Sequence, residues 1–453
     1  MAPRCAVAAA LRRRFPPRRG VRGATARHPR SDVRRPALRD HGQPTRRDAV
    51  YESGEFHRHR RGRRVARAVP RSCRPARARR SSTAARGGAF LLCKNGGELR
   101  GALPRNARHS PVKVVFFVPP AEQRSGGLDA AIDGLRGALE RRGVVVGDCL
   151  PDDAGDGVVH FHGLWQPAHA RAASECRSRG IPYVVSPHGM LEPWAWRHKR
   201  WKKWSYFHLV EKRHLARADA LLATAAQEAG RLRAFVAGQR IETLPLGMTG
   251  MARPDHAAAR AQLGWAAEER VLLFLSRIHV KKGLDLLLQA LASLPNDGRV
   301  RLVVVGDGRP EYVGQLKRYA AENSGVLPRI DWIGPVWGDA RWKYFQGADL
   351  FCLPTHSENF GLAVLEACQV GTPVLTTVET PWAALLADGR GFICQPRVDE
   401  IRTGLQRFLS QDRWSEDARG ALAEWAWSQF HWDTLAERYV NFYQTLRPET
   451  TGR

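Results

Sequence analysis

The pattern of hydrophobic and polar positions changes sharply near residue 112, where short apolar runs begin to alternate with stretches of helical periodicity. Runs of this kind, rich in β-branched residues and separated by amphipathic helices, predict a mostly parallel sheet. The first run, residues 112–118, leads into Gly126-Gly127 and a helix expected from about 128 to 142. Strand, glycine pair and helix in this order open a doubly wound α/β domain whose loop can approach a ligand closely. Further strands are expected at residues 158–161, 183–186, 220–223 and 241–244.

A second series of strands and helices begins near residue 271, after a polar, alanine-rich connector that runs from about 245 to 269. Its strands are expected at residues 271–275, 302–305, 330–333, 350–353 and 374–376, and an aromatic-rich helical stretch from 425 to 443 closes the chain. We therefore expect an α/β fold of two Rossmann-like halves that face a central cleft. The expected domains are a first one at 111–248, a second one at 266–430, and a C-terminal helix at 431–453 that packs back toward the first.

Residues 1–110 show neither helical nor strand periodicity, so we expect a disordered tail there. They carry 30 of the 72 Lys and Arg residues but only 6 of the 44 Asp and Glu, which leaves a nearly balanced remainder of 42 and 38. Three interpretations of the tail stay open: an organelle transit peptide, a disordered arm that binds polyanions such as nucleic acid, and translation from a start codon placed too far upstream. In the last case the true chain begins near Val112.

Two carboxylates, Glu358 and Glu366, follow the strand expected at 350–353 and flank the start of a helix near Gly361. N–H groups at a helix start attract anions, and α/β sheets bind ligands at the carboxyl ends of their strands. Glu358 can hydrogen-bond sugar hydroxyls, and Glu366 can hold a vicinal diol such as that of a ribose. Gly361 lets the backbone come close to a phosphate or a sugar. Either carboxylate could instead be a solvated surface residue, an alternative that the pattern leaves open.

Two cations, Arg277 and Lys282, follow the strand expected at 271–275 in the same way. The guanidinium of Arg277 can clamp a diphosphate with two hydrogen bonds, and Lys282 adds a point charge. In glycosyl transfer the nucleoside diphosphate leaves with growing negative charge, so fixed cations and helix N–H groups stabilise the transition state. The alternative is that both are ordinary surface charges.

Arg277, Lys282, Glu358 and Glu366, in this order within the second half, resemble the motif of the nucleotide-sugar glycosyltransferases of GT-B fold, family 4, which retain anomeric configuration. The resemblance extends from about residue 112 to 443. It implies that Glu358 contacts the donor sugar, Glu366 the ribose, and the two cations the diphosphate of a UDP- or GDP-linked sugar, with no further cofactor. The binding set also includes the residues between the carboxylates, Asn359, Phe360 and Gly361.

Three more segments, residues 160–165, 186–194 and 371–377, are similar to bacterial members that build exopolysaccharide or lipopolysaccharide chains. The resemblance matches His162 to an active-site histidine and places Gly126 and Gly127 near the donor phosphate or the acceptor. His188 is a further candidate, although a buried histidine can equally be a hydrogen-bonded core residue. One departure is 245–247, Pro-Leu-Gly where Pro-Asn-Gly is usual, which affects the turn geometry. No Asp-x-Asp triplet occurs, which argues against the metal-dependent GT-A arrangement, so no metal site is predicted.

A basic and aromatic segment runs from Trp194 to Arg217, with eight Lys and Arg residues against one acid, Glu211. Basic helices with interleaved aromatic residues suit an anionic membrane surface, which fits a saccharide or lipid-linked acceptor. The alternatives are that the aromatic face packs into the domain while the charges are solvated, or that the segment attracts an anionic acceptor.

The cysteines and the length of the apolar runs indicate where in the cell the protein acts. The eight scattered cysteines are typical of reduced thiols in an intracellular protein, and no apolar run reaches the roughly 18–20 residues of a bilayer span. We expect a cytoplasmic protein that can contact the inner face of the plasma membrane. Two rival functions stay open: a nucleic-acid-binding protein acting through the tail, although no specific nucleic acid is predicted, and a nucleotide-sugar epimerase of the same fold with a different set of carboxylates.

Overall fold

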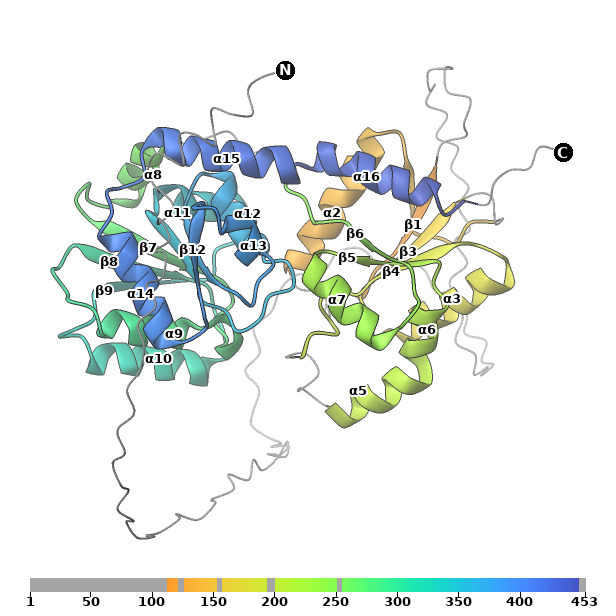
Figure 1. The fold of residues 1–453 in the computed structure, drawn as a ribbon, viewed down its shortest axis with the longest axis horizontal. Coiled ribbons are helices and arrows are strands. Elements are labelled where there is room, and N and C mark those ends of the chain that lie inside the picture. Colours follow the sequence, from red (N-terminus) through yellow and green to blue (C-terminus); the bar gives the residue numbers. More distant parts are fainter. Residues whose placement is uncertain (1–111, 121–125, 153–156, 194–199, 251–254, 448–453) are drawn as a thin grey trace, which may run out of the picture. The chain divides into compact units, whose positions relative to one another are not determined.

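The computed structural model of the 453-residue chain describes residues 112–120, 126–152, 157–193, 200–250 and 255–447. They form two parallel six-stranded sheets with helices on both faces of each sheet (Figure 1). The predicted α/β class, with two doubly wound halves, is confirmed. The tail predicted at residues 1–110 lies outside the described residues.

The first sheet has the strand order β2-β1-β3-β4-β5-β6. Its strands are β1 Lys113–Phe117, β2 Val145–Gly147, β3 Val158–His162, β4 Tyr183–Ser186, β5 Ala220–Ala223 and β6 Ile241–Thr243. The strands β3, β4 and β5 are buried along their whole length, as expected of parallel strands covered by helices on both faces. The chain reverses its direction across the sheet between β1 and β3, and such a switch point is where doubly wound sheets bind ligands.

Helices cover both faces of this sheet. They are α2 Gly126–Arg141, α3 Pro167–Ser178, α5 Arg200–Tyr206, the π-helical turn η3 Phe207–Glu211, α6 Lys212–Ala216 and α7 Ala226–Phe235. The last helix of the chain, α16 Trp432–Gln444, also belongs to this core, because Trp432, Tyr439 and Tyr443 pack with residues of β1 and α2.

The second sheet has the order β12-β11-β10-β7-β8-β9. Its strands are β7 Arg270–Leu275, β8 Val300–Val305, β9 Arg329–Gly334, β10 Leu350–Leu353, β11 Val374–Thr377 and β12 Gly391–Cys394. Strand β7 pairs with β8 on one side and with β10 on the other. The switch point therefore lies between β7 and β10, and the loops that follow these two strands must leave the sheet side by side.

Ten helices and helical turns are described around the second sheet. They are α8 His256–Leu263, η4 Val280–Lys282, α9 Leu284–Ala292, α10 Pro310–Glu322, η5 Gly338–Arg341, α11 Trp342–Gly347, α12 Leu362–Gln369, α13 Trp382–Leu386, α14 Val398–Leu409 and α15 Glu416–Phe430. In the described part of the chain, no helix combines the length and the apolar character that crossing a bilayer requires.

The structure differs from the expected pattern in three places. The connector expected at 245–269 contains α8, which Asp255 caps by accepting hydrogen bonds from the N–H groups of Ala257 and Ala258. The edge strands β2 and β12 are absent from the expected pattern, because three and four residues are too few to show a hydrophobic periodicity. The closing helical stretch is two helices, because His431 adopts an extended conformation between α15 and α16.

Candidate active site

The loops that follow β7 and β10 meet at the carboxyl edge of the second sheet. Lys282 forms an ion pair with Glu358, and the side chain of each is 14% exposed. The carbonyl oxygen of Lys281 accepts two further hydrogen bonds, from the hydroxyl of Thr355 at 2.9 Å and from the N–H of His356 at 2.8 Å. The structure therefore brings two of the predicted site residues into direct contact and ties their loops together.

Helix α12 begins directly after this contact. Its N-cap is Gly361, with φ 82°, and no side chain caps the helix, so its first N–H groups remain available to an anion. A Cβ at Gly361 would lie 2.9 Å from Cγ of Glu358, so a larger residue would displace that carboxylate. Asn359 lies in the same loop, whereas the side chain of Phe360 is buried and packs against Trp382. Phe360 can therefore serve a ligand only through its backbone.

Four cations gather around His279, the residue that precedes η4. Burial lowers the pKa of His279, and Arg277, Lys281, Arg309 and Lys282 lower it further. Arg277 and Arg309 are exposed, and neither forms an ion pair with any residue that the structure describes. An excess of positive charge at a strand edge, with two arginines outside any ion pair among the described residues, suits a polyanionic ligand such as a diphosphate.

Glu366 lies further along α12, where Nη2 of Arg341 contacts its Oε1 at 3.0 Å. Burial raises the pKa of Glu366, and the charge of Arg341 opposes this rise. The guanidinium of Arg341 also lies over the ring of Trp342, 4.6 Å from its centroid. Within the described residues, no hydrogen bond reaches Oε2 of Glu366, so this oxygen can accept one from a ligand.

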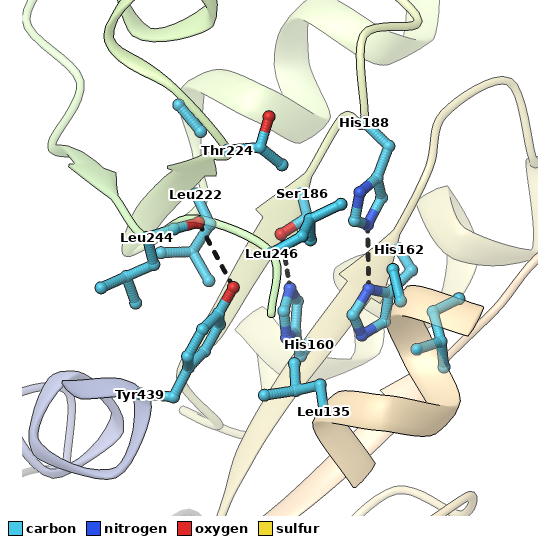
Figure 2. A pocket seen from close by; sticks show the side chains of 13 residues that line it. Leu135, His160, His162, Ser186, His188, Leu222, Thr224, Leu244, Leu246 and Tyr439 are labelled. Carbon is cyan, nitrogen blue, oxygen red and sulfur yellow. Dashed lines mark hydrogen bonds between the residues drawn. The ribbon is translucent and has the colours of Figure 1, made fainter. Parts of the chain in front are cut away.

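A cluster of histidines lies at the end of β3 in the first half (Figure 2). Nδ1 of His162 lies 3.0 Å from Nε2 of His188, and the two rings are stacked with an angle of 14° between their planes. Nε2 of His162 is buried and has no hydrogen-bond partner in the described part of the chain. Both histidines line a small cavity whose wall also includes His160, Ser186, Thr224 and Tyr439.

These histidines are held uncharged at neutral pH. Burial lowers the pKa of His160 and His162 well below its ordinary value, and it lowers the pKa of His188 to about 4. His160 is fixed by Tyr443, whose hydroxyl lies 2.8 Å from Nδ1, and by Ser186, whose hydroxyl lies 2.7 Å from Nε2. A neutral imidazole has one donor and one acceptor, so His162 can exchange a hydrogen bond with a sugar hydroxyl without adding charge.

The predicted site residues thus fall into two groups. Arg277, Lys282, Glu358, Gly361 and Glu366 lie around β7, β10 and α12 of the second half. His162 ends β3 in the first half, while Gly126 and Gly127 begin α2, the helix that follows the neighbouring strand β1. In the segments that the structure describes, no group of three His, Cys, Asp or Glu side chains is arranged to hold a metal ion.

Sequence reasoning missed several residues of these groups. Arg309 could have been found, because it directly follows the Gly306-Asp307-Gly308 turn at the end of β8. Arg341 and Tyr443 carry no local signal, because their partners lie 25 and 283 positions away in the chain. Only the fold brings these pairs together.

Comparison with known proteins identifies two family profiles in the chain. The profile described as "Glycosyl transferase 4-like domain" matches residues 76–247, and "Glycosyl transferases group 1" matches residues 255–423. A relative named D-inositol 3-phosphate glycosyltransferase, from Segniliparus rotundus, is 39% identical over 168 residues, which cover 36% of this chain and 37% of the relative. The chain spans about half the length of the curated relatives it matches.

Solved structures share the fold at low sequence identity. Sucrose-phosphate synthase from Thermosynechococcus elongatus is 18% identical, with a TM-score of 0.61, and the match covers 74% of this chain and 99% of that one. Anabaena HepE in complex with UDP-glucose is 19% identical, with a TM-score of 0.57, and the match covers 74% of this chain and 100% of that one.

Proposed function

The chain belongs to the GT-B glycosyltransferases of family 4, and from this premise we propose that it transfers a hexosyl unit from a nucleotide-diphosphate sugar with retention of configuration. The acceptor is a saccharide or a lipid-linked acceptor of cell-surface polysaccharide synthesis. The observation that carries the proposal is the Lys282–Glu358 ion pair beside the uncapped start of α12. A cation, a carboxylate and free helix N–H groups in one place suit a ligand in which a phosphate is joined to a sugar.

In the proposed arrangement, the domain at 266–430 holds the donor and the domain at 111–248 holds the acceptor. Arg277, Lys282 and the first N–H groups of α12 stabilise the departing diphosphate, the role that a metal ion plays in other transferases. Glu358 binds hydroxyls of the donor sugar, and Glu366 binds the ribose through its Oε2. His162 binds the reacting sugar while staying uncharged.

The chemical step breaks the bond between the anomeric carbon and the phosphate oxygen and forms a bond from the acceptor oxygen on the same face of the sugar. The departing phosphate accepts the proton of the acceptor hydroxyl, so the step needs no further base. Fixed cations favour this route because they stabilise the charge that develops on the leaving group.

The test begins with a thermal-shift screen of UDP-, GDP- and ADP-sugars on the full chain, since a ligand that binds only the native state raises the melting temperature. UDP is the first probe because the related HepE is described in complex with UDP-glucose. Glu358→Gln should abolish transfer, whereas Arg397→Ala, which removes an exposed cation far along the chain, should not. Near-native turnover by Glu358→Gln would contradict the site assignment.

The rival function through the tail is tested with the same protein. Removal of residues 1–110 should leave donor binding and turnover unchanged if the enzyme is a transferase. If the chain acts as a nucleic-acid-binding protein, the same deletion should abolish its only measurable activity, the binding of polyanions. An epimerase would convert a UDP-sugar without any acceptor, which product analysis would show.

We also propose that the enzyme is a cytoplasmic, peripheral protein that contacts an anionic membrane through the segment Trp194–Arg217. Residues 194–199 lie outside the described residues. Further along, Trp204 and Leu209 are 55% and 72% exposed and share the solvent side of the helical segment with Lys212 and Arg213. Apolar side chains bordered by cations fit the headgroup region of anionic lipid.

Co-sedimentation of the full chain with vesicles tests this contact. Binding should require anionic lipid, and Leu209→Ser should weaken it, whereas Trp337→Ser should not, although Trp337 is 74% exposed. Equal pelleting of Leu209→Ser and native protein, or binding to neutral vesicles alone, would refute the membrane surface.

A further inference from the structure

The loop after β4 carries backbone strain next to the histidine cluster. His188 has a φ of 50°, a left-handed conformation that costs on the order of 1–3 kcal/mol for a residue with a side chain. Gly189, which follows it, has a φ of 73°. A strained turn of this kind persists only when neighbouring groups hold it.

A backbone hydrogen bond of 3.1 Å from the N–H of Met190 to the carbonyl oxygen of Pro187 closes the turn. The side chain that holds it from outside is the carboxylate of Glu228, which is 3% exposed. Its Oε1 accepts a hydrogen bond of 2.7 Å from the N–H of Gly189. Its Oε2 accepts two of 2.8 Å, from the N–H and the hydroxyl of Thr224. Three donors converge on one buried carboxylate, so its position is fixed, and with it the position of the turn.

We propose that Glu228 is a positioning residue for catalysis, which sets the His188 ring against His162 and so orients Nε2 of His162 toward the reacting sugar. This inference rests on the proposed transferase function. The chain of contacts is continuous: Glu228 holds Gly189, the neighbouring His188 stacks on His162, and their nitrogens lie 3.0 Å apart. Nε2 of His162 is buried and unpaired in the described part of the chain, which leaves it free for a ligand.

The simpler role for Glu228 is a helix cap. It lies in the first turn of α7, and its bonds to Thr224 resemble a capping box, in which an acid in the first turn reaches back to the residues that precede the helix. The bond to Gly189 is different, because it joins α7 to a loop 39 positions earlier in the chain. A cap alone would affect stability, whereas a positioning residue would also affect the chemical step.

The surroundings of the histidine pair are relevant to any change in its charge. His188 faces His162 and His160 on β3, and Glu228 lies behind the turn on α7. Arg136 on α2 and His169 on α3 also lower the pKa of His162, and the effect of each is smaller than that of burial. Glu192 lies close enough to Glu228 to raise its pKa together with burial. Burial is the largest influence on His188, so loosening the turn should admit water and raise its pKa from about 4.

Kinetics of the full chain with its UDP-sugar test the proposal. Glu228→Gln keeps the shape of the side chain but replaces one acceptor oxygen with an NH2 group, so the backbone N–H of Gly189 or of Thr224 loses its acceptor. We expect kcat to fall at least about tenfold, since small misplacements of catalytic groups cost up to about 100-fold, while KM for the donor stays within about twofold. The matched control is Asp255→Ala, which removes the side-chain cap of α8 and should leave kcat unchanged.

A second measurement does not depend on turnover. The imidazole signals of His188, followed by NMR in the full chain, should titrate near 4 in the native protein and at a clearly higher pH in Glu228→Gln. An unchanged titration of His188, or a kcat of Glu228→Gln within about twofold of native, would overturn the inference. If the native protein transfers no sugar at all, the proposed function fails, and the NMR result still decides whether Glu228 holds the histidine turn.

Discussion

Replacing Arg341 with alanine should weaken the binding of UDP, and more strongly at low pH than at high pH. Arg341 is the one cation in contact with Glu366 among the described residues, and it counteracts the burial that raises the pKa of this carboxyl group. Without Arg341 the pKa of Glu366 rises further. The protonated carboxyl then accepts ribose hydroxyls less well, so affinity falls as the pH falls.

The exposure of the pair sets the size of the effect. The side chains of Arg341 and Glu366 are 25% and 20% exposed, between a surface pair and a fully buried one. Surface pairs contribute about 0.2–1 kcal/mol, and breaking a buried pair costs about 3–5 kcal/mol. An intermediate value of about 1–2 kcal/mol corresponds to a loss of roughly 5- to 30-fold in affinity at the pH where Glu366 is mostly protonated.

Stability should depend on pH in the opposite sense. A carboxyl group whose pKa is higher in the folded than in the unfolded state gives most stability below its unfolded value of 4.5, and this stability is lost as the pH rises through the folded value. Arg341→Ala raises the pKa of Glu366 in the folded state. The free energy of unfolding of this variant should therefore fall further below that of native protein as the pH rises from about 4.5.

Calorimetric titration of UDP into native protein, Arg341→Ala and Arg341→Lys, over a series of pH values from about 4.5 upward, measures the binding effect. Arg341→Lys keeps the charge and should lie close to native protein, and Arg397→Ala, which removes an exposed cation, should match native protein at every pH. A loss of affinity in Arg341→Ala that does not change with pH would refute the reasoning, and so would no loss at all.

Three further substitutions test the site and its supports. Lys282→Met should lower kcat by at least about 100-fold, because it removes a cation from the leaving group and leaves a half-buried carboxylate unpaired; steady-state kinetics measure this. Gly283→Ala should lower the melting temperature and abolish UDP binding, because Gly283 has a φ of 72° and a Cβ there would lie 2.0 Å from the carbonyl oxygen of Pro354. The control is Gly264→Ala, which has a φ of 64° but open space around it, and which should lower the free energy of unfolding by only about 1 kcal/mol. Tyr443→Phe should cost about 1–3 kcal/mol in urea unfolding, because it removes the hydroxyl that bonds a buried histidine.

Much of the fold follows from local pattern. The central strands are buried on both faces, so they appear in the sequence as continuous apolar runs, and β4, β5 and β10 lie at the residues that this pattern predicts. Strand β2 escaped prediction because it is a three-residue edge strand with an exposed valine, Val145. Helix α8 was hidden in an alanine-rich segment without a clear apolar stripe, although Asp255 supplies a readable cap.

From the sequence, site residues could be brought together only where they follow the ends of neighbouring strands. The loop with Lys282 and the loop with Glu358 could be paired from sequence, because parallel strands bring their carboxyl ends to one edge. Glu228 could not, since its role depends on a bond to a loop 39 positions away. Pairs of this kind arise from packing between elements, and no local period records them.

Lys282 and Glu358 neutralise one another in the structure without a donor, so neither charge is left without a partner. Each side chain is only 14% exposed, and a charge taken out of water is costly unless a partner compensates it. A nucleotide sugar offers a new partner to each side chain: its diphosphate can pair with Lys282, and its sugar hydroxyls can bind Glu358. UDP has the diphosphate but no donor sugar, so it would leave Glu358 without a partner when it draws Lys282 away. The full sugar nucleotide should therefore bind more tightly than UDP in native protein, and this advantage should disappear in Glu358→Gln, where the uncharged amide needs no compensation.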